Sequence, residues 1–180
     1  MSNKSSQIII LCEDTQQEVF VRRFLKKAKN IDGKMLRVVK NPSGKGSGEQ
    51  FVRKEFPAQL TALRTRRAKT DLIVVIDADL SEVALIKQKL ETACSQSNIE
   101  QRNASDRVSF IIPKRNIETW IQFLDGSETN EILVYPKSQK ESNCKSAVDH
   151  LYKLCLSPDS TLGFPPSLLD ACQEYKRLEM

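Results

Sequence analysis

The sequence predicts an α/β protein with a mostly parallel sheet of about four strands and helices on both faces. Two observations lead to this prediction. Short runs of β-branched and aliphatic residues alternate along the chain with segments that carry apolar residues at helical spacing. Strands that are apolar throughout are typical of a parallel sheet covered on both faces. The 180 residues, 39% of them hydrophobic and 28% charged, fit one domain with a real core.

The elements are expected in the following order. Apolar runs predict strands over residues 7–12, 35–39, 71–76 and 108–112. Helical spacing predicts helices from about residue 16, over 49–69, after residue 81, and over 117–124, 144–156 and 167–178. Thr15 and Glu18 have the spacing of a capping box, and Pro57 should break or restart the second helix. This alternation of strand and helix is Rossmann-like.

Composition divides the chain into three segments. Residues 1–6 are expected to form a flexible N-terminal tail, residues 7–125 the α/β core, and residues 126–180 a loop and helical C-terminal extension packed on the core. No apolar run approaches the ~18 residues of a membrane helix, and the N-terminus has no apolar signal segment. The 5 cysteines are odd in number and form no Cys-x-x-Cys pair, which is typical of reduced thiols. We therefore expect a cytoplasmic protein that does not contact a membrane.

Residue counts narrow the possible chemistry. His150 is the only histidine and lies in an ordinary helical pattern, so histidine metal sites and Ser-His or Cys-His catalysis would all depend on it. The 28 Lys and Arg against 23 Asp and Glu leave a formal charge of +5, which is compatible with phosphate binding but does not establish it.

Acidic residues follow two of the predicted strands. Glu13 and Asp14 come after the first strand, and Asp77 and Asp79 after the third. Ligands bind at the carboxyl ends of parallel strands, and a strand order of 2-1-3-4 would bring these acids together. Carboxylates that converge repel one another unless a cation lies between them, and oxygen ligands of this kind suit Mg²⁺ or Mn²⁺. Alternatively, the two aspartates cap the next helix or form an Asx turn.

These residues carry a family resemblance. A hydrophobic strand that ends in Glu13, followed by another that ends in Asp77-Ala78-Asp79, resembles the TOPRIM domain of topoisomerases, primases and OLD-type nucleases. The resemblance covers roughly residues 7–125. It implies that Glu13, Asp77 and Asp79 bind Mg²⁺ (or Mn²⁺) and are catalytic in phosphodiester chemistry. The family usually has glycine after the glutamate, where this chain has Asp14.

A second stretch extends the resemblance. Residues 113–120, with Glu118 and Trp120, resemble the acidic-aromatic segment of small stand-alone TOPRIM-like proteins such as the RloB group. This implies a Mg²⁺-dependent nuclease acting on DNA or RNA as the effector of a bacterial anti-phage system. The partners implied are nucleic acid, an ATPase and, in a homo-oligomer, other copies of the chain. Glu118 would be a further catalytic acid, or else an acid placed by the helix dipole.

Cationic residues are expected around the same edge of the sheet. Two cations directly follow the fourth strand and could contact phosphate. Lys114 is the candidate catalytic cation, and Arg115 is the candidate nucleic-acid ligand. Lys45 lies in a Gly/Ser-rich loop ahead of a helix N-terminus, which suits an anion, although the loop lacks P-loop spacing. A basic run at the end of the second predicted helix contains Arg64, Arg66 and Arg67. It predicts contacts with backbone phosphates of a nucleic acid or, alternatively, a solvated helix end.

Three other classes of protein share parts of this pattern. A receiver domain has acids after its first strand and an aspartate after its third. It also expects a hydroxyl residue that ends strand four and a lysine that ends strand five, whereas the fourth predicted strand here ends in Ile111-Ile112-Pro113. A haloacid-dehalogenase-like phosphatase carries its Asp-x-Asp after the first strand, whereas Asp77 and Asp79 follow the third. The non-enzymatic alternative is a TOPRIM-like scaffold or regulatory subunit, whose acidic site binds metal without turnover or whose surface docks onto an ATPase.

Overall fold

The sheet is four-stranded and entirely parallel, which confirms the predicted fold class. The computed structural model describes residues 7–155 and 163–178, and the tail predicted at residues 1–6 lies outside them. The strand order is β2-β1-β3-β4. The strands are β1 (Gln7–Cys12), β2 (Leu36–Lys40), β3 (Thr70–Val75) and β4 (Val108–Ile111).

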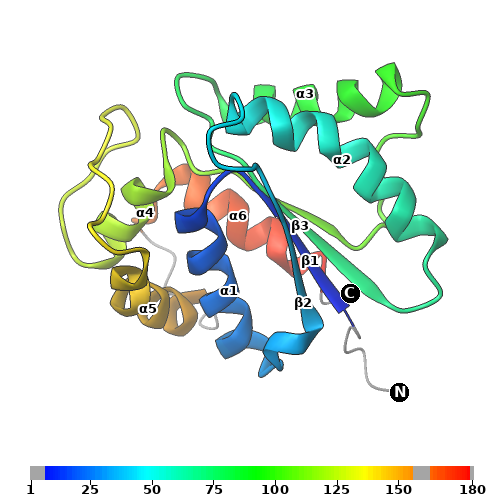
Figure 1. The fold of residues 1–180 in the computed structure, drawn as a ribbon. Helices are drawn as coiled ribbons and strands as arrows, with labels where there is room; N and C mark the ends of the chain where they lie inside the picture. The colour runs from blue at the N-terminus through cyan, green and yellow to red at the C-terminus, as the bar shows by residue number, and fades with distance from the viewer. Residues whose placement is uncertain (1–6, 156–162, 179–180) are drawn as a thin grey trace.

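Helices cover both faces of the sheet, as Figure 1 shows. α2 and α3 lie on one face, and α1, α4, α5 and α6 lie on the other. No helix within residues 7–155 and 163–178 is long and apolar enough to span a bilayer. The bounds are α1 (Thr15–Lys29), η1 (Gly33–Met35), α2 (Gly48–Thr65), α3 (Val83–Gln96), α4 (Ile117–Leu124), η2 (Glu141–Cys144), α5 (Lys145–Cys155) and α6 (Pro166–Lys176).

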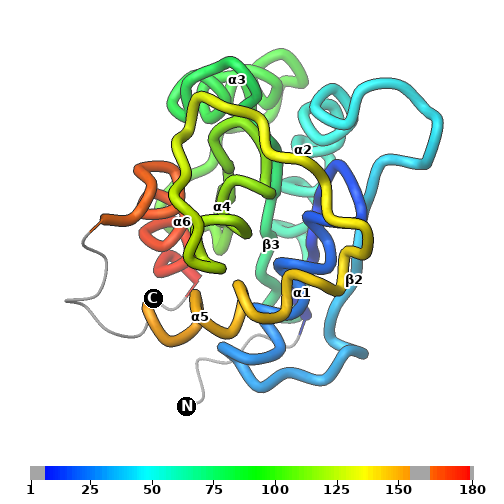
Figure 2. The backbone as a smooth tube through the Cα atoms, turned by 90° about the vertical axis from the view of Figure 1, so that its left-hand side faces the viewer, coloured from blue at the N-terminus to red at the C-terminus, as the bar shows by residue number. Residues whose placement is uncertain are grey.

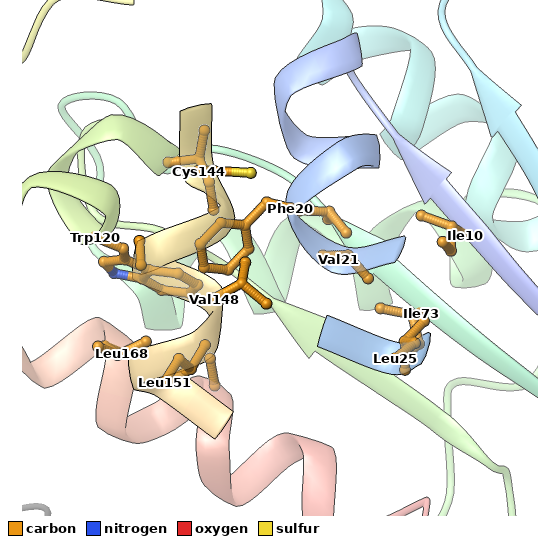
Figure 3. Packing of buried hydrophobic residues seen from close by; sticks show 14 of the residues in the cluster. Ile10, Phe20, Val21, Leu25, Ile73, Trp120, Cys144, Val148, Leu151 and Leu168 are labelled. Atoms are coloured by element: carbon orange, nitrogen blue, oxygen red, sulfur yellow. The ribbon is translucent and has the colours of Figure 1, made fainter. Parts of the chain in front are cut away.

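Each face of the sheet packs into its own hydrophobic cluster, because successive side chains of a strand point to opposite faces. Ile9 of β1 is buried in the cluster under α2 and α3, together with Phe56. Ile10 is buried in the other cluster, where Phe20 of α1 lies 6.5 Å from Trp120 of α4 between ring centroids (Figure 3). The central strands are therefore covered on both sides, as their uniformly apolar sequence predicts.

The C-terminal helices complete the second cluster. Leu151 of α5 and Leu168 of α6 are buried in it (Figure 3). The indole Nε1 of Trp120 donates a hydrogen bond to Ser167 Oγ at 2.8 Å, which fixes the start of α6 against α4. The described part of residues 126–180 therefore packs on the α/β core.

Between α4 and η2 the chain crosses the surface without helix or strand, over residues 125–140, which we call the strap. In Figure 2 the strap is yellow and passes in front of α4, from the side of α3 to that of α1 and β2. Asn116 Nδ2 donates to the Tyr135 carbonyl oxygen at 3.0 Å, and the Ser167 N–H donates to the Glu131 carboxylate at 3.0 Å. Side-chain contacts thus hold the strap to α4 and α6.

The expected break at Pro57 is wrong. α2 continues through the proline without interruption. Phe56 and Leu60, on either side of it, are fully buried against the sheet. Burial of this continuous apolar face outweighs the roughly 3 kcal/mol that a proline costs in a helix interior.

Candidate functional site

Glu13 and Asp77 meet at the carboxyl edge of the sheet. β1 and β3 are neighbours, with Leu11 opposite Val74, so the residues that follow them emerge side by side. Glu13 Oε1 accepts a hydrogen bond from the Asp77 backbone N–H at 2.6 Å. The two acids therefore converge, as the strand order predicts.

Gln17 orients Glu13 from the first turns of α1, where its side chain is fully buried. Gln17 Oε1 accepts from the Glu13 backbone N–H at 2.9 Å, and Gln17 Nε2 lies 3.5 Å from Glu13 Oε1. One amide thus holds both the backbone and the carboxylate of Glu13.

Asp14 takes the place where the TOPRIM resemblance expects glycine. Its φ of −142° is extended, a conformation that any residue adopts, so the turn after β1 does not need glycine. Asp14 Oδ1 accepts from the Gln17 N–H at 3.0 Å and caps α1. The predicted capping box on Thr15 and Glu18 is therefore wrong, because Asp14 already occupies the cap position. Asp14 Oδ2 forms an ion pair with Lys137 of the strap, at 3.0 Å.

Gly48, the first residue of α2, lies directly against Glu13. A Cβ atom at this position would be 2.7 Å from both the Cβ and the Oε2 of Glu13. Any side chain here would displace Glu13, so the close approach requires glycine. It also places the N-terminus of α2, with its partial positive charge, at the Glu13 carboxylate.

Asp79 and Arg115 lie in two tight loops that pair with each other. Both have positive φ, 50° for Asp79 and 69° for Arg115, and an isolated antiparallel bridge joins them. The Ala78 N–H donates to the Pro113 carbonyl oxygen at 2.8 Å, which ties the same two loops together. Non-glycine residues in this conformation are uncommon and store strain, and such residues cluster at functional sites.

Four buried carboxylate oxygens of the described residues have no hydrogen-bond partner. Two belong to Glu49 and Asp170, which form ion pairs with Arg53 and Lys87. The other two are Asp77 Oδ1 and Glu118 Oε1, whose side chains form no ion pair among the described residues. Glu118 is only 2% exposed, in the first turn of α4. A helix dipole explains an acid in a first turn, but it does not explain why that acid is buried. A buried carboxylate oxygen without a partner is costly, and a cation would satisfy it.

We call Glu13, Asp14, Asp77, Asp79 and Glu118 the acid cluster, because their charges act on one another. Burial raises the pKa of Glu13 to about 7, even though the Asp77 N–H and the Gln17 amide lower it. Burial, then the charges of Glu13 and Asp14, raise the pKa of Asp77 well above its usual value. Burial also raises the pKa of Glu118. Without a cation, burial therefore favours the protonated forms of Glu13, Asp77 and Glu118.

These shifts predict how the stability of the metal-free protein depends on pH. The pKa of Glu13 is raised on folding, so its contribution to stability is complete below about pH 4.5 and is lost as pH rises towards 7. The melting temperature in EDTA is therefore expected to fall between about pH 5 and pH 7. Glu13→Gln should flatten that dependence, because glutamine does not titrate. Melting curves that rise over this range, or that Glu13→Gln leaves unchanged, would contradict the prediction.

Lys114 and Arg115 occupy the same edge of the sheet but have different surroundings. The ammonium of Lys114 pairs with Glu82, the N-cap residue of α3, and its backbone N–H donates to Ser167 Oγ at 3.1 Å. Lys114 thus faces α3 and α6, whereas the backbone of Arg115 is paired with the acid-cluster residue Asp79. Lys45 is exposed in the loop before α2, three positions from Gly48.

The structure separates the basic run from the acid cluster. Arg64 is bound to both oxygens of Asp106, at 3.0 and 2.7 Å, and so has a structural partner. Arg66 donates to the side chain of Gln7, at the opposite end of β1 from Glu13, at 2.6 Å. Arg67 is exposed beside them. The 18 residues of α2 span roughly 27 Å, so these arginines and the acids lie at opposite ends of the sheet.

Two residues that contact the acid cluster, Gln17 and Lys137, were not identified from the sequence. Gln17 looked like an ordinary polar residue near a helix start, although its position one turn after Glu13 is a usable signal. Lys137 lies in a polar loop 123 residues from its partner Asp14, so no local pattern points to it.

The donor types at the site fit a divalent cation such as Mg²⁺. Carboxylate oxygens are the ligands that Mg²⁺ and Mn²⁺ prefer, and Asp77 and Glu118 each present an oxygen without a partner. Within residues 7–155 and 163–178, however, no three His, Cys, Asp or Glu side chains are already arranged to hold an ion. Binding would therefore require the side chains to turn towards one point.

Comparison of the chain with protein-family models, with curated proteins and with solved structures gives no match in any of the three. The case for a function therefore rests on the site.

Proposed function

We propose that the protein is a divalent-cation-dependent nuclease that hydrolyses phosphodiester bonds of DNA or RNA. Glu13, Asp77 and Asp79 would hold Mg²⁺ or Mn²⁺, and Glu118 would act beside them. The observation that carries the proposal is a pair of buried, partnerless oxygens at the carboxyl edge of a parallel sheet: one on Asp77, which binds Glu13, and one on Glu118, whose charge acts on Asp77.

The residues around the site have distinct tasks in this proposal. Gln17 and the Asp77 N–H hold Glu13 in one orientation, so a bound cation would require the other acids to turn towards it. The bridge to Arg115 fixes the loop that carries Asp79. A divalent ion bound here would polarise the phosphate and lower the pKa of an attacking water. None of these tasks requires a histidine.

The main alternative is a TOPRIM-like scaffold or regulatory subunit that binds a cation without turnover. Catalysis needs a more exact ligand geometry than binding does, so acids that are not pre-arranged around one point favour the alternative. The support for a role of this chain beside an ATPase in anti-phage defence, as effector or as scaffold, is the family resemblance. The strap exposes consecutive apolar side chains, Ile132, Leu133 and Val134, which suit a protein contact.

The receiver alternative is less well supported by the fold. A receiver needs a lysine after a fifth strand, but β4 is the last strand among residues 7–155 and 163–178, and helices follow it. The residue after the β4 segment Val108–Ile111 is Ile112, which has no hydroxyl. Asp79 would also have no task in phospho-acceptance.

The nuclease proposal is tested on the purified full chain. Supercoiled plasmid, linear duplex DNA and single-stranded RNA are each incubated with Mg²⁺, with Mn²⁺ and with EDTA. Cleavage of at least one substrate with a divalent cation and none in EDTA is the expected result. Calorimetric titration with Mn²⁺ measures cation binding separately. Binding of Mn²⁺ without cleavage of any substrate would overturn the nuclease and favour the scaffold.

A further inference from the structure

Lys137 is the cation that the fold places on the acid cluster. Among the ion pairs within residues 7–155 and 163–178, the pair of Lys137 and Asp14, at 3.0 Å, is the one that involves a member of the cluster. The charges of Glu118 and Asp77 also raise the pKa of Lys137, after the larger effect of Asp14, so the ammonium is within electrostatic range of these acids. Glu118 is 2% exposed and keeps an oxygen without a partner, so the cluster retains an unsatisfied carboxylate besides the one that Lys137 pairs.

The strap holds Lys137 in this position through contacts on either side. Before it, the Tyr135 carbonyl oxygen accepts from Asn116 Nδ2 at 3.0 Å, which ties the strap to α4. After it, the Glu141 carbonyl oxygen accepts from Gln16 Nε2 at 3.3 Å, which ties the chain to α1. Lys137 therefore reaches the cluster from a segment fixed at two points and does not depend on the ion pair alone for its position.

Neighbouring lysines have other partners. Lys114 pairs with Glu82 at the start of α3. Lys40, at the end of β2, pairs with Glu18 at 2.8 Å. The side chain of Lys137, by contrast, is 72% exposed, with only its ammonium held at Asp14. An exposed pair of this kind contributes little to stability, so the ammonium can bind a second anion at little cost.

The acid cluster alone would repel a polyanion, so a nucleic-acid substrate needs a cation on the same surface. We propose that Lys137 contacts a backbone phosphate of the nucleic-acid substrate at the acid cluster, and that Asp14 is the residue that positions it. This inference rests on the proposed nuclease function. It assigns to Lys137 the task that the sequence suggested for Lys114.

Binding and salt dependence test the proposal without relying on turnover. The affinity of the full chain for a short fluorescein-labelled single-stranded DNA is measured by anisotropy in Ca²⁺ over a range of NaCl concentrations. Lys137→Ala is expected to weaken binding about tenfold and to reduce the slope of log K against log salt by about 1, as loss of one phosphate contact requires. Lys137→Arg should restore both. Asp14→Asn keeps the helix cap but also removes an acid that repels DNA, so it is made both in the wild-type chain and in Lys137→Ala. A loss of affinity that appears only when Lys137 is present supports positioning by Asp14, and the same effect in both chains overturns it.

Lys140→Ala is the matched control, because it removes the same charge from the same exposed strap. If Lys140→Ala reduces affinity and slope as much as Lys137→Ala, overall charge explains binding and the proposal is overturned. If Lys137→Ala leaves DNA binding unchanged and only tightens Mn²⁺ binding, the lysine is a counter-ion and the proposal is again overturned. A wild-type chain that cleaves DNA with unaltered binding in Lys137→Ala refutes this inference alone. A wild-type chain that neither binds nor cleaves refutes the nuclease as well.

Discussion

The substitution Asp77→Asn is expected to lower nuclease activity and to raise the stability of the metal-free protein. Asp77→Asn should lower cation-dependent cleavage about 10³-fold, because loss of several kcal/mol of transition-state stabilisation corresponds to about three factors of ten in rate. At a pH high enough to ionise the acids, the same change should stabilise the metal-free fold by about 1–3 kcal/mol, because a carboxylate buried beside the charges of Glu13 and Asp14 is replaced by a neutral amide. The Asp77 N–H that binds Glu13 is unaffected.

Urea unfolding in EDTA and initial cleavage rates in Mn²⁺ measure the two effects on the same protein. Asp149→Asn is the control, because Asp149 is an aspartate about one-third exposed whose two oxygens pair with Lys27 and Lys145 on the surface. Its substitution should change neither the rate nor the unfolding free energy by much. If Asp77→Asn destabilises the metal-free protein, Asp77 has a structural task that the candidate site does not explain.

The sequence predicted the sheet well because buried parallel strands leave a direct signal. β1 and β3 are covered on both faces, so each is a continuous apolar run with an acid shortly after its end. The convergence of Glu13 and Asp77 then follows from strand order alone. Their local geometry depends on Gln17 and Gly48, whose contacts with Glu13 form only when α1 and α2 pack at this edge of the sheet.

Charged residues were harder to interpret, because the sequence does not reveal distant partners. Arg64 suggested a phosphate ligand, but its carboxylate partner Asp106 lies 42 residues further on. Lys114 looked free beside the site, yet Glu82 holds it. Lys137 gave no signal, yet it reaches the acid cluster. Long-range ion pairs therefore decide which cations of a basic chain are available to a substrate.

Removal of the Asp71 carboxylate is expected to have the largest effect on the fold. Asp71 is fully buried near the start of β3, where it pairs with Lys29 of α1 at 2.9 Å and with Arg107 at 2.7 Å. Arg107 also donates to the carbonyl oxygen of Leu178. Asp71→Ala leaves two largely buried cations without this partner and should cost about 3–5 kcal/mol. For a domain of this size, that corresponds to a melting temperature lower by roughly 10 °C.

Calorimetry on Asp71→Ala and on Asp170→Ala provides the comparison. In the control, Lys87 keeps its second partner Glu174 at 3.0 Å, so the loss should stay below about 1 kcal/mol. Equal melting temperatures for the two variants would mean that the buried network contributes no more than a surface pair. Asp71 lies at the amino end of β3 and Asp77 beyond its carboxyl end. Asp71→Ala should therefore leave Mn²⁺ affinity unchanged well below its melting temperature, because the two ends of the strand serve stability and binding separately.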